Sequence, residues 1–236
     1  MTQNRISNIL KDVINILLPI SCFGCNARLY RGETFLCTSC RHQLPLTEYN
    51  FNEENAVDRI FYGRINIKKA NSFLFFTEIG IVKNLIHFLK YKNQESIGQF
   101  LGDWHGQILK EQDHLTDIDF VIPVPLHSKK LRHRGYNQVA LFAKQIALHI
   151  NANYADDILI KTANTKTQTK KNRLSRWHDN RSLYEIHNKQ ILKNKSILLV
   201  DDVITTGATM EICANTFKDI EGITIYISSM AIVPKT

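Results

Sequence analysis

The chain has 236 residues, of which 44% are hydrophobic and 22% charged, and its formal net charge is +8. This composition is ordinary for a globular protein, and the length is sufficient for one sizeable α/β core with a small accessory module. The positive charge favours polyanionic partners or phosphorylated ligands.

The first segment, residues 6–20, is rich in apolar side chains spaced i, i+3, i+4, i+7 and i+8, which predicts an amphipathic helix. Lys11 and Asp12 interrupt the apolar run, which is too short to span a bilayer, and no small-residue cleavage site follows. A helix lying on a membrane surface stays open, but its polar face carries few basic residues, so packing on a neighbour is favoured. We expect no membrane span and a cytoplasmic location.

Four of the five cysteines form two CxxC pairs separated by eleven residues: Cys22 with Cys25, and Cys37 with Cys40. Two such turns offer four thiolates, which is the tetrahedral ligand set of structural zinc. A redox CxxC would not need the second pair, and without a secretory signal a metal is favoured over disulfides. Residues 1–45 are therefore predicted to be a helix followed by a small zinc module.

Residues 46–236 are predicted to form a second, α/β domain. Its first part contains strand-like hydrophobic stretches at 60–76 and helix candidates at 79–91 and 96–110. From residue 116, strands alternate with helices, which indicates a mostly parallel sheet flanked by helices. The expected strands are 119–125, 157–161, 197–200 and 223–233, and the expected helices are 136–150 and 207–219.

Residues 161–195 are strongly basic, with ten Lys and Arg against Asp179 and Glu185, so they account for the whole net charge. A segment this polar, with few apolar anchors, is predicted to be a flexible loop or an exposed arm. It could bind a pyrophosphate group or a nucleic-acid backbone, and its sequence does not distinguish between these two ligands.

The stretch ILLVDDVITTGAT, residues 197–209, carries the clearest functional signal. We expect its strand to stop at two carboxylates and a turn rich in hydroxyls to lead into a helix. Backbone N–H groups at a helix start attract phosphate, glycine permits close approach, and threonines add donors, whereas a simple helix cap needs only one such side chain. The predicted ligand-binding residues are Asp201, Asp202, Thr205, Thr206, Gly207, Ala208 and Thr209.

This stretch resembles the signature for phosphoribosyl pyrophosphate (PRPP) in type I phosphoribosyltransferases. The resemblance implies the type I phosphoribosyltransferase fold, with PRPP bound together with Mg²⁺. It also implies that Asp201 and Asp202 contact the ribose hydroxyls and that residues 205–209 bind the 5-phosphate.

Other motifs are similar to the ComF (competence F) family: Leu89-Lys-Tyr91, Pro123-Val-Pro125, Arg134-Gly-Tyr-Asn-Gln138, the paired CxxC motifs, and a basic stretch with Gln168 and Arg176. The chain departs from that pattern at Lys161, where an arginine is expected, and at Asp179, where an asparagine is expected. The resemblance implies a role in natural transformation, with single-stranded DNA and other competence proteins as partners.

Several residues around a predicted turn are candidates for the pyrophosphate. Arg134, Asn137 and Gln138 begin a helix, and a planar guanidinium binds phosphate bidentately. Gln168 and Arg176 are further candidates in the basic segment. Lys90 could also be a ligand, but a surface lysine that ends a helix is favoured.

Three functions remain open at this point. The chain could be an active phosphoribosyltransferase that lets an unknown nitrogen acceptor displace pyrophosphate, a nucleic-acid-handling protein with PRPP as ligand, or a sensor that has lost turnover. Tyr136, Trp177 and Tyr184 lie in or near basic stretches and could stack on bases, although simple packing is favoured for each. The acceptor and the oligomeric state cannot be predicted from the sequence.

Overall fold

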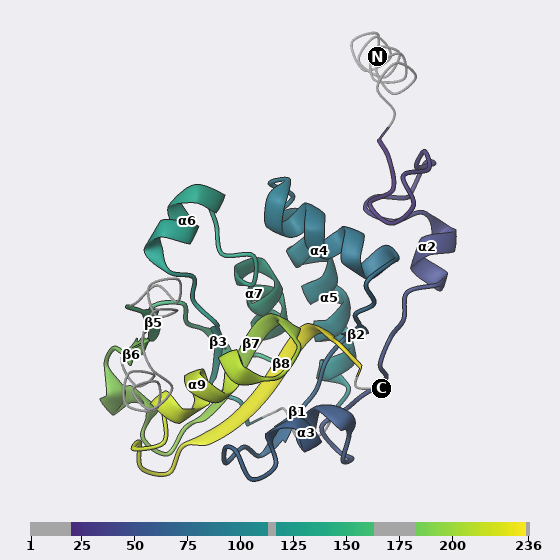
Figure 1. Cartoon of the computed structure of the whole chain (residues 1–236). Helices are drawn as coiled ribbons and strands as arrows, with labels where there is room; N and C mark the ends of the chain where they lie inside the picture. Colours follow the sequence, from purple (N-terminus) through teal and green to yellow (C-terminus); the bar gives the residue numbers. More distant parts are fainter. Residues whose placement is uncertain (1–19, 113–116, 163–182, 235–236) are drawn as a thin grey trace, which may run out of the picture.

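The computed structural model describes residues 20–112, 117–162 and 183–234. They form a mixed α/β fold around a six-stranded sheet in which all the described strand pairings are parallel (Figure 1). The order is β1-β8-β7-β3-β4, and β2 also pairs with β8. The strands are β1 Lys69–Ala70, β2 Leu74–Phe75, β3 Phe120–Pro123, β4 Asn153–Tyr154, β7 Ser196–Ile204 and β8 Thr224–Ile232.

Helices cover both faces of this sheet. The helices are α2 Thr38–His42, α3 Ala56–Phe61, α4 Ile81–Tyr91, α5 Ser96–Lys110, α6 Ser128–Arg134, α7 Ala140–His149 and α9 Ala208–Thr216, with a 3₁₀-helix η4 at Lys189–Leu192. None of the helices in the described part of the chain combines the length and the apolar character needed to cross a membrane. The helix expected at residues 6–20 lies outside the described residues, apart from Ile20.

Alternation along β7 divides the core into two layers. Leu198 and Val200 pack in a cluster with α4, α5 and α7, whereas Ile197 and Leu199 pack in a second cluster with α3 and α9. All four side chains are fully buried. A strand buried on both faces has a continuous apolar run because successive side chains point to opposite faces.

The close packing of α5 on α7 depends on small side chains. Gly98, Gly102 and Gly106 recur every fourth residue on α5 and are buried. A Cβ atom at Gly102 would lie 2.6 Å from the backbone oxygen of Phe142 in α7. The glycines therefore let the two helix backbones approach closely, which sets the position of α7 against α5.

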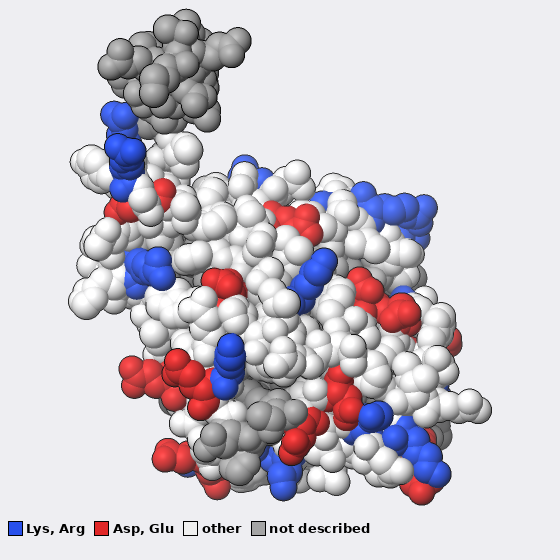
Figure 2. All heavy atoms as spheres, turned by 180° about the vertical axis from the view of Figure 1, so that it is seen from behind, with Lys and Arg blue, Asp and Glu red and all other residues white. Residues whose placement is uncertain are grey.

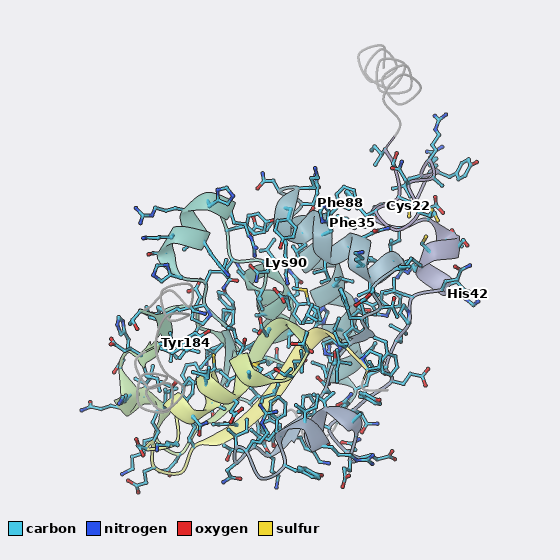
Figure 3. All side chains as sticks on the ribbon, viewed as in Figure 1. Cys22, Phe35, His42, Phe88, Lys90 and Tyr184 are labelled. Carbon is cyan, nitrogen blue, oxygen red and sulfur yellow. The ribbon has the colours of Figure 1, made fainter. Side chains whose placement is uncertain are left out.

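The cysteine module packs directly on α4 and α5, two of the helices that cover one face of the sheet. The rings of Phe23 and Phe88 are 4.9 Å apart, and those of Phe35 and Phe100 are 5.1 Å apart, so the module contacts both α4 and α5 (Figure 3). Asn84 of α4 donates a hydrogen bond of 2.7 Å from Nδ2 to the carbonyl oxygen of Gly24. The division into domains at 1–45 and 46–236 remains a prediction. In the described part of the module, residues 20–45, the buried side chains belong to the same hydrophobic cluster as those of the sheet.

Three predicted elements differ in the structure. The region 60–76 holds the end of α3 and only the short strands β1 and β2, rather than longer strands. The strand expected at 157–161 is β5, Leu159–Lys161, which pairs antiparallel with β6, Tyr184–Ile186, in a separate sheet. The 183–195 part of the basic segment thus forms β6 and η4 and buries Tyr184 and Leu192.

Candidate functional site

Asp201 and Asp202 lie within β7, near its carboxyl end. The strand does not stop at the carboxylates, as expected from the sequence, but continues to Ile204 because β8 still pairs with it beyond them. Since side chains alternate along a strand, the two carboxylates belong to opposite faces of the sheet. They therefore have different neighbours.

The carboxylate of Asp202 is held from two sides. Its Oδ1 accepts a hydrogen bond of 2.8 Å from Lys90 Nζ at the end of α4, and its Oδ2 accepts one of 2.6 Å from Gln138 Nε2 before α7. Arg134 Nη1 donates in turn to Gln138 Oε1. Asp202 is buried, with 7% of its surface exposed, and a carboxylate has about four acceptor positions, so it can still accept bonds from a ligand hydroxyl.

Lys90 is therefore not the free surface lysine that the sequence favoured. Its side chain is 21% exposed and pairs with Asp202 across more than a hundred residues of sequence. Figure 3 shows Lys90 between α4 and the sheet. The charge pair, together with the hydrogen bond from Gln138, holds the carboxylate of Asp202 in one position.

Asp201 has a different environment, on the side of α9 and β6. Burial, and next the charge of Asp202, raise the pKa of Asp201 to about 7. Lys161 lies near enough to oppose this shift, and its Nζ donates a hydrogen bond of 2.9 Å to the hydroxyl of Tyr184. Cys213 of α9 is fully buried in the same cluster, as expected for a small packing residue.

The loop after β7 is exposed on both sides of a buried glycine. Gly207 adopts φ +77°, and Thr205, Thr206, Ala208 and Thr209 around it are exposed. A Cβ atom at position 207 would lie 2.7 Å from Ile60 Cγ2 and 2.8 Å from a ring carbon of Phe61. Only glycine fits both the backbone conformation and the close contact with α3.

The position of α3 behind this loop is itself fixed by polar contacts. Asn55 and Asp58 form a capping box at its start, and Asp58 Oδ1 accepts a hydrogen bond of 2.7 Å from the backbone N–H of Ala70 in β1. Asn55 Nδ2 donates to the Ala70 oxygen at 2.8 Å. These bonds attach α3 to the edge strand, and α3 in turn supports the loop.

Arg64 clamps the same loop from outside. Its Nη1 donates to the backbone oxygen of Thr206 at 2.7 Å, and its Nε donates to Glu211 Oε2 of α9 at 3.1 Å. The guanidinium therefore fixes the loop to the first turn of the helix that follows it. No feature of the sequence indicated this residue, because Arg64 and Thr206 are far apart in the chain.

The predicted pyrophosphate residues divide into three groups. Arg134 and Gln138 join the Asp202 network described above. Asn137 instead donates from Nδ2 to the carbonyl oxygen of Val124 at 3.0 Å, so in this structure it holds the turn after β3. Gln168 and Arg176 lie outside the described residues, and all five stay predictions as ligand-binding groups.

Two of the three aromatic residues considered for base stacking are buried. Tyr136 is 9% exposed and donates to the carbonyl oxygen of Leu89, and Tyr184 is 3% exposed beside Lys161. Packing, which the sequence favoured for both, is what the structure shows. Trp177 lies outside the described residues.

The four paired cysteines converge at the other end of the molecule. The Sγ atoms of Cys22, Cys25, Cys37 and Cys40 all lie within 4.8 Å of one another, and those of Cys25 and Cys37 are 3.8 Å apart. Zn–S bonds of about 2.3 Å in a tetrahedron give sulfur separations of about 3.8 Å. The four residues are thus positioned to hold a metal ion.

Backbone N–H groups donate hydrogen bonds to a sulfur atom of this cluster. The N–H groups of Gly24 and Cys37 donate to Cys22 Sγ, each at 3.3 Å. Burial raises the pKa of Cys22, but these N–H groups together with that of Cys25 outweigh it and lower the pKa to about 7. These N–H groups therefore favour the thiolate form of Cys22, which is the form that binds a metal.

Comparison with known proteins finds one domain family and several relatives. Residues 139–225 match the phosphoribosyl transferase domain family, and this range contains the loop from Asp201 to Thr209 but not the cysteine cluster. The chain is 25% identical to Competence protein F of Haemophilus influenzae over 199 residues, which cover 80% of this chain and 86% of the relative. It is 24% identical to Competence protein ComFC of Bacillus subtilis over 214 residues, covering 90% and 83%.

A further relative is the DNA utilization protein YhgH of Escherichia coli. It is 27% identical over 133 residues, which cover 53% of this chain and 56% of the relative. The two competence proteins are thus matched over most of their length, whereas YhgH is matched over about half of its length.

Proposed function

We propose that this chain, a ComF-type protein of the phosphoribosyltransferase family, binds PRPP at the end of β7 and acts in the handling of single-stranded DNA. The observation that carries the PRPP part is the position of Asp202. It is held between Lys90 and Gln138 at the carboxyl end of a parallel strand, where ligands of open α/β sheets bind.

Each part of the ligand has a partner in this proposal. Asp201 and Asp202 accept bonds from the ribose hydroxyls, one carboxylate from each face of β7. The exposed loop 205–209 binds the 5-phosphate through backbone N–H groups at the start of α9 and through threonine hydroxyls. Arg134, with Gln168 and Arg176 from the basic segment, meets the pyrophosphate, and Mg²⁺ accompanies PRPP and neutralises part of its charge.

The metal held by the four cysteines is, in this proposal, a structural zinc ion. Four protein ligands leave no open position, so the ion supplies no catalysis. Its contribution is to hold residues 22–40 in the conformation that packs against α4 and α5. Reduced thiols of this kind are consistent with a location in the cytoplasm.

The DNA part rests on the relatives and on charge. The relatives are named for competence and for DNA utilization, and a chain with a net charge of +8 favours a polyanionic partner. Other competence proteins are further partners in this proposal.

Transfer of the phosphoribosyl group is the alternative function. It is favoured by one observation, the retention of both carboxylates beside an intact loop around Gly207. In that case a nitrogen acceptor displaces pyrophosphate at C1 of the ribose, and the residues named above orient PRPP and stabilise charge. Pyrophosphate release from PRPP in the presence of a panel of nitrogenous bases measures this activity. If no base causes release, the alternative is overturned and PRPP binding without transfer is the function that remains.

The test of the proposed function is a calorimetric titration of PRPP with Mg²⁺ into the wild-type protein and into a variant with Asp201→Asn and Asp202→Asn. The variant is expected to lose binding, because an amide accepts fewer bonds and carries no charge, while the protein stays folded. Asp219→Asn, an exposed aspartate beyond α9, is the matched control and should bind like wild type. Equal affinity of wild type and double variant would overturn the site assignment.

A further inference from the structure

An exposed tyrosine stands beside the phosphoribosyl site. Tyr91 is the last residue of α4, follows Lys90 directly, and is 68% exposed. Its ring centroid lies 5.8 Å from the guanidinium carbon of Arg134 and 5.3 Å from the ring of His87, which is also exposed. A large ring left in solvent with cationic and aromatic neighbours has the composition of a stacking platform for a nucleobase.

The helix that carries Arg134 is a second unexplained feature. None of the residues of α6, SKKLRHR, is buried, so the helix adds little to the core. Lys129, Lys130 and Arg132 on it are exposed and make no ion pair among the described residues. Figure 2 shows basic side chains together at the upper right, where α6 lies, whereas basic and acidic side chains are interspersed over the rest of that face.

The tyrosine and the basic helix are connected to the phosphoribosyl site by direct contacts. Arg134 donates to Gln138, which donates to Asp202, and Lys90 beside Tyr91 also donates to Asp202. Tyr136 donates to the carbonyl oxygen of Leu89, so the end of α4 and the segment after α6 are joined a second time. The platform and Asp202 are therefore parts of one contiguous network.

We propose that Tyr91 and Arg134 form a platform on which one base of single-stranded DNA stacks, while the neighbouring phosphates contact Lys129, Lys130 and Arg132 of α6. This inference rests on the proposed function and gives its DNA part a location. A duplex would hide its base faces from the ring, whereas a single strand presents a base face and a phosphate backbone together.

The test is fluorescence anisotropy of a fluorescein-labelled oligothymidylate titrated with the full-length protein. Tyr91→Ala is expected to weaken binding roughly 5- to 150-fold, the effect of losing one stacked base. Tyr91→Phe keeps the ring and should remain within about twofold of wild type. Tyr62→Ala is the matched control, because Tyr62 is 59% exposed at the end of α3, away from α6, and should also bind like wild type.

A second measurement addresses the basic helix. Replacing Lys129 and Lys130 with alanine should lower the slope of log affinity against log salt concentration by about 0.7 for each phosphate that a lysine no longer neutralises. Because α6 buries no side chain, these changes should leave the melting temperature close to that of wild type.

The outcomes separate this inference from the proposed function. If Tyr91→Ala binds the oligonucleotide as tightly as Tyr62→Ala does, the platform is overturned, while DNA binding and the PRPP site stand. If the wild-type protein binds no oligothymidylate, the platform and the DNA part both fall, and the PRPP titration is unaffected. Weaker binding by Tyr91→Ala with normal binding by Tyr91→Phe supports stacking.

Discussion

The cysteine cluster and the proposed phosphoribosyl site at the end of β7 are assembled in opposite ways. All four cysteines come from one stretch of chain, residues 22–40, and backbone N–H groups of that stretch turn toward their sulfur atoms. Asp202, by contrast, is held by Lys90 and Gln138, which come from other elements, and Arg64 clamps the phosphate loop from a third. A local site is defined by the spacing of its residues along the chain. A site made from distant segments depends on the tertiary packing that brings those segments together.

This difference predicts different responses to mutation. Damage to a local site should be confined to the module that contains it, although its energetic effect there is large. Damage to the phosphoribosyl site should spread to every segment that contributes to it. The following predictions test this contrast and its consequences, from the largest expected effect to the smallest.

The largest effect is expected for Cys22→Ser. The variant should lose the metal, which the wild-type protein is expected to hold at about one ion per chain, and the module should unfold, because metal binding and folding are coupled in such sites by about 10 kcal/mol or more. Metal analysis and the near-ultraviolet signal of Phe23, Phe35 and their aromatic neighbours measure this.

The matched control is Cys213→Ala, since Cys213 is buried on α9 outside the cluster. It should keep the full metal content. Because α4 stays packed on the sheet through Leu85 and Leu89, PRPP affinity of Cys22→Ser should change by about twofold or less. A large loss of PRPP affinity would mean that the two sites are not independent.

The second effect concerns Gly207→Ala in the phosphate loop. The new Cβ atom meets Ile60 and Phe61 at less than 3 Å, and the positive φ adds strain, so the free energy of unfolding should fall by roughly 2 to 4 kcal/mol. PRPP affinity should fall as well, because α3 and the loop must move apart. Chemical denaturation and calorimetry measure the two losses.

Gly32→Ala separates the two causes. Gly32 also has a positive φ, +93°, but a Cβ atom there would meet nothing within 4 Å. Its substitution should cost only the backbone strain, about 1 kcal/mol. If both variants lose the same stability, the contact between α3 and the loop is not what requires glycine at position 207.

The smallest effect is a pH dependence of PRPP binding. The pKa of Asp201 is raised to about 7, and ribose hydroxyls that donate to it favour its ionised form. Binding should therefore strengthen several-fold as the pH rises from about 6 to about 8, with proton release that can be measured by calorimetry in buffers of different ionisation enthalpy. Asp201→Asn should remove the part of the pH dependence that comes from this carboxyl group. The pH dependence that remains should come only from ionisation of PRPP itself.

The same raised pKa has a consequence for stability. An acid with a folded-state pKa above its unfolded value binds its proton more tightly in the folded protein, so the free energy of unfolding should fall as the pH rises from about 4 through about 7. Asp201→Asn should flatten this decline. A stability curve unchanged by the substitution would mean that Asp201 ionises at its ordinary pKa.

The sequence by itself determined the local features of this protein. The spacing of the cysteines predicted the cluster, the helix expected at 79–91 corresponds to α4, and the helix expected at 96–110 coincides with α5. The alternation of strands and helices predicted the mostly parallel sheet. These signals survive in a single sequence because each depends on residues within a few turns of one another.

Only the tertiary structure decided which distant groups meet. It carried β7 past the two aspartates, because β8 continues to pair there, and so placed them on opposite faces. It paired Lys90 with Asp202, set Arg64 on Thr206 and left Tyr91 exposed beside Arg134. Long-range contacts of this kind leave no local pattern, because they depend on how separate elements are placed around the sheet rather than on the order of residues within each element.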